Sequence, residues 1–174
     1  NHSPEAMAMH AANHPDCLHI IQDIMQAKPE DVVAAGGGGP VALAWFSPDC
    51  KHHSKAKGGR PPSKNIRDLA WVVVGWAKRV SPAVIAFENV EEFQSWGPLL
   101  SNGRPDPARK GETYQKWVAA LEAEGYVFEA RELVAHHYGE RTSRNRLFGI
   151  ARRDGKQVQW PEPTHGPGLL PYRT

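Results

Sequence analysis

The chain has 174 residues, of which 40% are hydrophobic and 23% are charged, as expected for one globular domain with a buried core. No apolar run of about 18 residues is present, which excludes a membrane-spanning helix, and no secretory signal is visible, so we expect a cytoplasmic protein. Two cysteines exclude a disulfide framework, and a net charge of +2 is too small to identify a nucleic-acid-binding protein.

The first part of the chain predicts two helices and two strands. Ser3, with proline next, caps a helix that should end near His14. Residues 17–21 (CLHII) are short, apolar and partly β-branched, which indicates a strand ending at Asp23. Pro29 opens a short helix. The glycines at 36–39 predict a plain loop, because a strand (41–46) follows them where a phosphate-binding loop needs a helix.

The rest of the chain alternates helices and strands. After a long polar loop (47–63), apolar residues at three- and four-residue spacings predict a helix over 66–80, and a second helix should cover 111–126 with Gly125 as its stop. A loop rich in Pro, Gly and Arg (95–110) precedes the second helix. Strands are predicted at 83–87, leading into Glu88 and Asn89, at 126–134 and at 146–153; Asp154–Gly155 should turn the chain into a last strand at 157–160.

This alternation predicts an α/β fold in which a mostly parallel sheet carries helices on both faces. In such sheets the functional site lies at the carboxyl ends of the strands. Asp23, the loop after Phe46, the Glu88–Asn89 pair and the loop after Val134 should therefore lie on one rim.

Cys50 is the candidate nucleophile. It follows a predicted buried strand, and the positive charge of Lys51 and two neighbouring histidines favours the reactive thiolate, whereas Asp49 opposes it. A cysteine in a loop is nevertheless more often an inert small residue, so the position alone does not establish a role.

Glu88 and two arginines are the other candidates for chemistry. A carboxylate at the end of an apolar strand is costly unless it is paired or used, although an acid facing water is the simpler interpretation. Arg144 and Arg146 alternate with period two and so point to one face, where they suit a carbonyl oxygen or a phosphate. For most such arginine pairs, however, a solvated strand start is the better interpretation.

Four segments in this order resemble the DNA cytosine carbon-5 methyltransferases, most closely phage or prophage types: Ser47-Pro48-Asp49-Cys50, Glu88-Asn89-Val90, Thr142-Ser143-Arg144-Asn145-Arg146 and Pro161-Glu162-Pro163-Thr164-His165. The resemblance implies an S-adenosylmethionine-dependent methyltransferase (Rossmann-like) fold. It also implies that residues 1–160 form a central part of the catalytic domain, and that residues 161–174 lead toward a target-recognition domain. A bacterial or phage-encoded enzyme of restriction and modification would be expected.

The resemblance assigns a role to each candidate. Cys50 would attack carbon 6 of a cytosine turned out of double-stranded DNA, and Glu88 would supply a proton to ring nitrogen 3. Arg146 would hold the carbonyl oxygen at carbon 2, with Arg144 supporting the site or a phosphate. Asn89 would orient the loop that carries the cysteine.

Cofactor and DNA contacts follow from the same resemblance. Asp23 would accept a hydrogen bond from the adenine amino group of S-adenosylmethionine, with Pro48 and Asn1 as further cofactor contacts. The polar loop offers contacts to backbone phosphates, although solvated loop charge is an equally good interpretation; the candidates are Lys51, Ser54, Lys55, Lys57 and Arg60.

Two departures and an absence qualify the resemblance. Asp49 stands between Pro48 and Cys50, where the family usually has Pro-Pro-Cys-Gln, and Thr142 replaces the usual glutamine. Both differences bear on the expected rate of methyl transfer. The family's first two strands and cofactor loop do not occur in this sequence; those strands would lie between 17–21 and 41–46. We therefore expect either two unpaired sheet edges or direct pairing of 17–21 with 41–46, weak cofactor binding, and a partner chain or further segments that supply the cofactor loop and target recognition.

Other functions remain open at this stage. A metal-binding module would use Cys50, His52, His53, Cys17 and His19, but this spacing is not a standard zinc pattern and we expect no metal. A cysteine hydrolase would leave Glu88, Asn89 and the two arginines without a role. A non-catalytic DNA-binding remnant, or one subunit of a split methyltransferase, is the strongest alternative.

Overall fold

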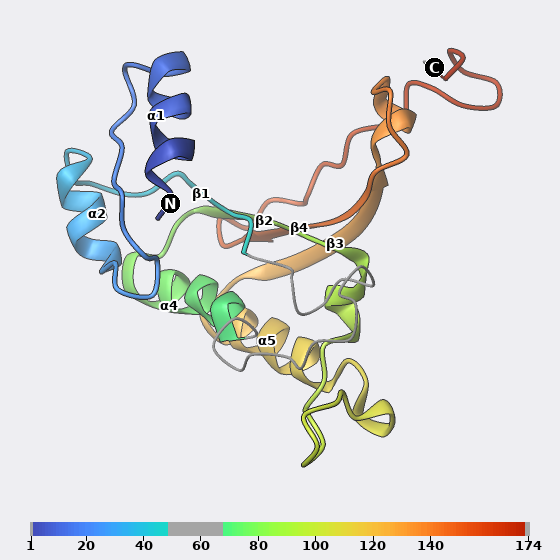
Figure 1. Cartoon of the computed structure of the whole chain (residues 1–174), viewed down its shortest axis with the longest axis horizontal. Coiled ribbons are helices and arrows are strands. Elements are labelled where there is room, and N and C mark those ends of the chain that lie inside the picture. The colour runs from blue at the N-terminus through green and yellow to red at the C-terminus, as the bar shows by residue number, and fades with distance from the viewer. Residues whose placement is uncertain (1, 49–67, 173–174) are drawn as a thin grey trace.

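The computed structural model describes residues 2–48 and 68–172, and within them a four-stranded sheet is covered by helices (Figure 1). The helices are α1 (Pro4–Asn13), α2 (Pro29–Ala35), α4 (Trp71–Val80) and α5 (Glu112–Ala123). The strands are β1 (Leu43–Phe46), β2 (Val84–Asn89), β3 (Val127–Val134) and β4 (Asn145–Arg152). Short 3-10 turns are η2 (Asp68–Ala70), η3 (Glu91–Ser95), η4 (Pro107–Arg109) and η5 (Ala135–Tyr138).

The strands lie in the order β1-β2-β4-β3, and the sheet is mixed. Strand β1 is parallel to β2, whereas β4 is antiparallel to both β2 and β3. The α/β class is confirmed, but the expectation of a mostly parallel sheet is wrong for this part of the chain. The reason is the connection from β3 to β4, which contains only η5 and is too short for the crossover that a parallel pair requires.

The core lies between one face of the sheet and the helices α4 and α5. Side chains that alternate along β2 and β4 pack against Trp117 of α5 and Phe93 of η3. The indole of Trp117 is fully buried and donates to the Ala70 carbonyl at 2.9 Å, so α5 is held against the start of α4. The large, fully buried side chains at the centre are Ile85, Phe87, Phe93, Trp117, Leu121 and Leu147.

The opposite face of the sheet is crossed by the extended segment that follows β4. The indole of Trp160 donates to Glu129 of β3 at 3.2 Å and lies under the guanidinium of Arg131. In the described residues no core-packed helix covers this face: α4 and α5 both lie on the other side, and α1 has no buried residue. The expected helical layer is thus present on one face only.

Two predicted strands are absent from the described structure. Residues 17–21 form no strand, and Leu18 and Ile21 are 60% and 56% exposed. They pair neither with β1 nor with any other described strand, so the idea of direct pairing is also wrong. Residues 157–160 form no strand either, because β4 already has β2 on one side and β3 on the other and offers no free edge.

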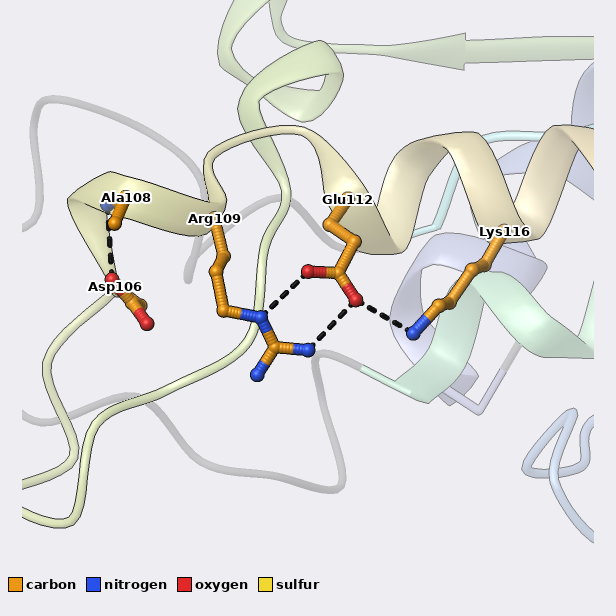
Figure 2. A network of polar contacts seen from close by, with 5 residues as sticks. All are labelled: Asp106, Ala108, Arg109, Glu112 and Lys116. Atoms are coloured by element: carbon orange, nitrogen blue, oxygen red, sulfur yellow. Dashed lines mark hydrogen bonds and ion pairs between the residues drawn. The ribbon is translucent and has the colours of Figure 1, made fainter.

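The predicted helices at Pro4, Pro29 and 111–126 are confirmed, and their ends follow the local sequence. The Ser3 hydroxyl accepts from the Ala6 amide, and Gly125 takes a positive φ of 85° after α5. At the start of α5, Glu112 binds the Arg109 guanidinium through two hydrogen bonds and also the Lys116 ammonium (Figure 2). These cations hold the pKa of the Glu112 carboxyl at about 2.

We predict that Glu112→Gln removes a pH-dependent part of the stability. A depressed carboxyl pKa stabilises the fold above the unfolded-state value near 4.5 and ceases to do so as the pH falls to about 2. Thermal unfolding of both proteins should show the variant melting lower at pH 6, with the difference vanishing toward pH 2. A constant difference across this range would contradict the assignment. Because the group is exposed, the effect should also shrink with added salt.

Candidate active site

Glu88, Arg144 and Arg146 lie together at the rim where β2 ends and β4 begins. The Nε of Arg146 lies 3.2 Å from the Glu88 Oε1, and the Arg144 Nη2 lies 3.8 Å from the same oxygen. The side chains of Glu88 and Arg146 are 21% and 24% exposed, whereas that of Arg144 is 58% exposed. A half-buried carboxylate thus faces one well-enclosed guanidinium and one that is open to solvent.

The antiparallel register brings these residues together. Glu88 pairs with Phe148, so the period of two along β4 places Arg146 on the same face as Glu88, beside it. This face is the one opposite the α4–α5 core. The two-residue alternation of Arg144 and Arg146 that suggested a shared face is therefore found in the structure as a cluster around Glu88.

A small pocket of about 220 Å³ opens between these charged groups and an apolar wall. Glu88 and the two arginines line one part of it. The remainder consists of side chains from β3, η5, β4 and the segment after β4: Leu133, Ala135, Tyr138, Phe148 and Pro161. A flat, polar-edged ring of the size of a nucleobase matches this combination of apolar walls with a few directed polar groups.

Sequence reasoning missed the apolar wall. Phe148 continues the period of two from Arg146 and was available from the alternation. Tyr138 was not, because its position depends on the fold of η5 and on the hydroxyl contact to the Pro161 carbonyl at 3.4 Å.

Asn89 connects the end of β2 to the segment that leads into the polar loop. Its side chain is buried, with 3% of the residue exposed. The amide nitrogen donates to the Pro48 carbonyl at 3.2 Å, and the amide oxygen accepts from the Val90 amide at 2.9 Å. Pro48 is thereby fixed beside the end of β2, two positions before Cys50 in the sequence.

The expected cofactor residues are less clearly arranged. Asp23 is exposed, and its carboxylate accepts from the Met25 amide at 2.9 Å within a local turn. Next to it, a hollow of about 900 Å³ lies between α1, residues 18–24, the end of β1 and α4; Gln22, Ile24 and Pro48 line it. Pro48 thus lines this hollow, whereas the Asp23 carboxylate is engaged in a local turn.

The remaining candidates lie outside the described residues: Asn1, Cys50, Lys51, Ser54, Lys55, Lys57 and Arg60. Within residues 2–48 and 68–172, no group of three or more His, Cys, Asp or Glu side chains is placed to hold a metal ion. Cys17 is exposed and forms no disulfide. No helix in these ranges is long and apolar enough to cross a membrane.

Comparison with known proteins places the chain in a family. Residues 1–168 match the model of the C-5 cytosine-specific DNA methylases. The chain belongs to this family. Its identity to the type II methyltransferase M.AgeI of Thalassovita gelatinovora is 28% over 168 residues, which cover 95% of the chain and 36% of that protein. With M.AquIA of a Picosynechococcus strain it shares 28% identity, covering 93% of the chain and 69% of the relative.

Solved methyltransferase structures show the same fold. A putative DNA modification methyltransferase encoded within an E. coli prophage superimposes with a TM-score of 0.66 at 19% identity, over 87% of the chain and 38% of that structure. The DNMT2 of Spodoptera frugiperda gives 0.65 at 16% identity, over 99% of the chain and 48% of that structure. This methylase-family chain thus spans well under two thirds of most of the relatives that it matches.

We predict that the Asn89 bond to Pro48 can be measured through stability. Asn89→Ala leaves the Pro48 carbonyl and the buried Val90 amide without these partners, which should lower the free energy of unfolding in urea by about 1–3 kcal/mol. Asn102→Ala serves as the control, because the Asn102 side chain also accepts from a backbone amide but at an exposed loop position, where its loss should change stability little. Equal losses in both variants would contradict the role of the buried amide.

Proposed function

We propose that this chain forms the central catalytic part of a DNA cytosine-5 methyltransferase. The observation that carries the proposal is the cluster of Glu88, Arg144 and Arg146 at the mouth of an apolar-walled pocket. The tie from Asn89 to Pro48 supports it, because that tie fixes the segment preceding Cys50 beside the same rim.

The chemistry needs these side chains because carbon 5 of cytosine is a weak nucleophile. Addition of the Cys50 thiolate to carbon 6 makes carbon 5 electron-rich, and a proton delivered to ring nitrogen 3 by Glu88 neutralises the charge that develops on the ring. After carbon 5 has taken a methyl group, a water molecule would take up the carbon-5 proton as the thiolate is expelled, and ring nitrogen 3 would return its proton to Glu88, which restores the aromatic ring. The complete cycle thus returns the cysteine and the carboxyl group to their starting states.

The arginines have two different tasks in this proposal. Arg146 is the better enclosed, and its guanidinium would hold the ring carbonyl oxygen while it remains paired with Glu88. Arg144 is exposed, so it would contact a phosphate or the edge of the pocket. The apolar wall with Tyr138 and Phe148 would pack against the faces of the ring.

The proposed cofactor is S-adenosylmethionine, which supplies the methyl group when bound. The hollow between residues 18–24 and β1 is large enough for a ligand of this size and reaches Pro48, next to the nucleophile loop. Gln22 and Ile24 are the residues of this chain that would contact it there. Asp23 would have to leave its turn with Met25 to accept from the adenine amino group.

Double-stranded DNA is the proposed substrate, and the target base must leave the stack to reach the pocket, at a cost of a few kcal/mol. Lys51, Lys55, Lys57 and Arg60, with Ser54, would bind backbone phosphates and offset that cost. We place this reaction in the cytoplasm of a bacterial host.

We also propose that further strands, from the same protein or from a partner chain, extend the sheet at β1. In the described structure β1 stands at the end of the sheet, and its Leu43 and Trp45 are 56% and 59% exposed. An apolar edge strand of this kind is a template for another strand. The hollow beside it is where the cofactor side of the site would be completed. Residues 161–174 would lead from the catalytic part to a target-recognition domain.

The decisive experiment traps the covalent step. We expect duplex DNA that contains 5-fluorocytosine, incubated with the chain and millimolar S-adenosylmethionine, to form an adduct that survives denaturing electrophoresis. Cys50→Ala should abolish the adduct. Cys17→Ala should retain it, because that exposed cysteine lies outside the proposed site.

The same incubation separates the alternatives. Loss of the adduct in Cys17→Ala rather than Cys50→Ala would overturn the assignment of the nucleophile. Retained duplex binding without any adduct, at saturating DNA and cofactor, would favour the non-catalytic DNA-binding remnant.

Cofactor affinity gives an independent prediction. Calorimetric titration of the chain alone with S-adenosylmethionine should show a dissociation constant weaker than micromolar, because the hollow is bounded on one side by the end strand of the sheet and by residues that form no strand. A micromolar constant would show that this chain suffices for cofactor binding.

A further inference from the structure

A polar cluster beneath the proposed catalytic rim has no part in the chemistry described above. Its centre is Asn145, whose side-chain nitrogen donates at 2.9 Å to a carboxylate oxygen of Glu91 and at 2.9 Å to one of Glu132. Gln94 donates to the other oxygen of Glu132 at 3.1 Å. We call Asn145, Glu91, Glu132 and Gln94 the Asn145 cluster.

The Asn145 cluster joins three parts of the rim. Glu91 and Gln94 belong to η3, which follows directly after the end of β2. Glu132 lies near the end of β3, and Asn145 is the first residue of β4. One amide group therefore holds together the segments that deliver Glu88 and Arg146 to the pocket.

The cluster and the catalytic candidates occupy opposite faces of β4. Asn145 has the parity of Leu147, which faces the α4–α5 core, whereas Arg146 projects from the other face toward Glu88. The Arg146 guanidinium is held at two points, by Glu88 at 3.2 Å and by the backbone carbonyl of Asn145 at 2.7 Å. The side-chain contacts of Asn145 on the core face therefore also fix its backbone carbonyl, which accepts from the Arg146 guanidinium.

The state of the Asn145 amide oxygen indicates that this side chain does more than fill space. It is buried and has no hydrogen-bond partner among the described residues. The amide cannot relieve this by turning over, because its oxygen would then face two carboxylates. A buried acceptor without a partner is unfavourable, and such groups in native structures call for an explanation. Asn145 nevertheless keeps its hydrogen bonds to Glu91 and Glu132, although its own oxygen has no partner among the described residues.

From these contacts we propose that Asn145 is a positioning residue, which sets the Arg146 guanidinium against Glu88 through the Asn145 peptide. Its amide acts as a two-pronged donor that keeps the ends of β2, β3 and β4 in one arrangement. Asn145 itself touches no reacting atom. Only the expected effect on catalysis rests on the proposed function. The effect on the position of Arg146 can be measured without any activity.

The first test observes Arg146 directly by nuclear magnetic resonance of arginine Nε–H groups in the full chain. Arg146→Lys identifies the signal by its loss. Asn145→Ala should make the Arg146 Nε–H exchange with solvent about tenfold faster, because the guanidinium loses its fixed place in the ion pair with Glu88 and opens to solvent. The backbone amides of β4 from Gly149 onward should keep their positions. Unchanged exchange in a folded Asn145→Ala protein would overturn the proposal.

A variant with the donors and acceptors of the cluster exchanged separates the positioning role from a simple loss of folding. In Asn145→Asp combined with Glu91→Gln and Glu132→Gln, the central side chain accepts from two amides where it formerly donated to two carboxylates. We expect this variant to fold and to restore slow Arg146 exchange. If it folds while Arg146 exchanges as fast as the exposed Arg144, the proposal is wrong.

A second test uses the single variant Asn145→Asp, which places a third carboxylate beside those of Glu91 and Glu132. Glu91 and Glu132 line a hollow of about 400 Å³ together with the charged side chains of Glu92 and Lys110. Mutual repulsion favours uptake of one proton, and the protonated acid can donate again. Adduct formation relative to wild type should therefore rise as the pH falls from about 8 toward 5. A ratio that does not change with pH would indicate a merely structural residue. If the wild type forms no adduct at all, the proposed function fails while the exchange measurement still decides the positioning role.

Discussion

The antiparallel insertion of β4 between β2 and β3 is the constraint on which the site depends. Because β4 runs against β2, its first residues meet the last residues of β2, and the pair Asn89–Leu147 stands at that end. An acid at the carboxyl end of one strand is thereby placed 3.2 and 3.8 Å from two arginines at the amino end of another. A parallel β4 would have sent the arginines to the opposite rim.

The same short stretch of β4 serves two layers. Residues of one parity enter the core against α5, and residues of the other parity face the pocket. Gly149 shows how tightly β4 packs against its neighbour, since a Cβ there would lie 2.6 Å from the Phe128 ring. The rim is thus supported by a rigid aromatic core, which is the condition for holding charged groups at fixed distances.

Sequence alone predicted the elements that are determined by local signals, such as apolar composition and helix capping. Strands β2, β3 and β4 carry enough apolar residues to be recognised, and the capping of α1 and the stop at Gly125 are local signals. Residues 17–21 and 157–160 have strand-like composition but form no strand, because a strand forms only by pairing with a neighbour in the fold, which composition does not encode. The antiparallel pairing of β3 with β4 could also have been predicted, since the ten residues 135–144 between them are too few for a crossover helix. Glu88, Arg144 and Arg146 were found by their place on the rim, whereas Tyr138 and the Asn145 cluster depend on the folds of η5 and η3.

The two sides of the sheet differ in how much of their apolar surface is covered. Beneath β2, β3 and β4 the aromatic side chains of α5 and η3 form a continuous core, in which Phe87, Phe93 and Trp117 contact one another. At β1 the apolar side chains of Leu43 and Trp45 lie on the opposite face and are largely exposed, although the Trp45 ring contacts that of Phe148. The scaffold of Glu88 and Arg146 therefore obtains its apolar stabilisation from the covered side, to which β1 contributes Ala44 and Phe46. It follows that strands added at the free edge of β1, as proposed, would complete the hollow beside it and leave unchanged the core that supports Glu88 and Arg146.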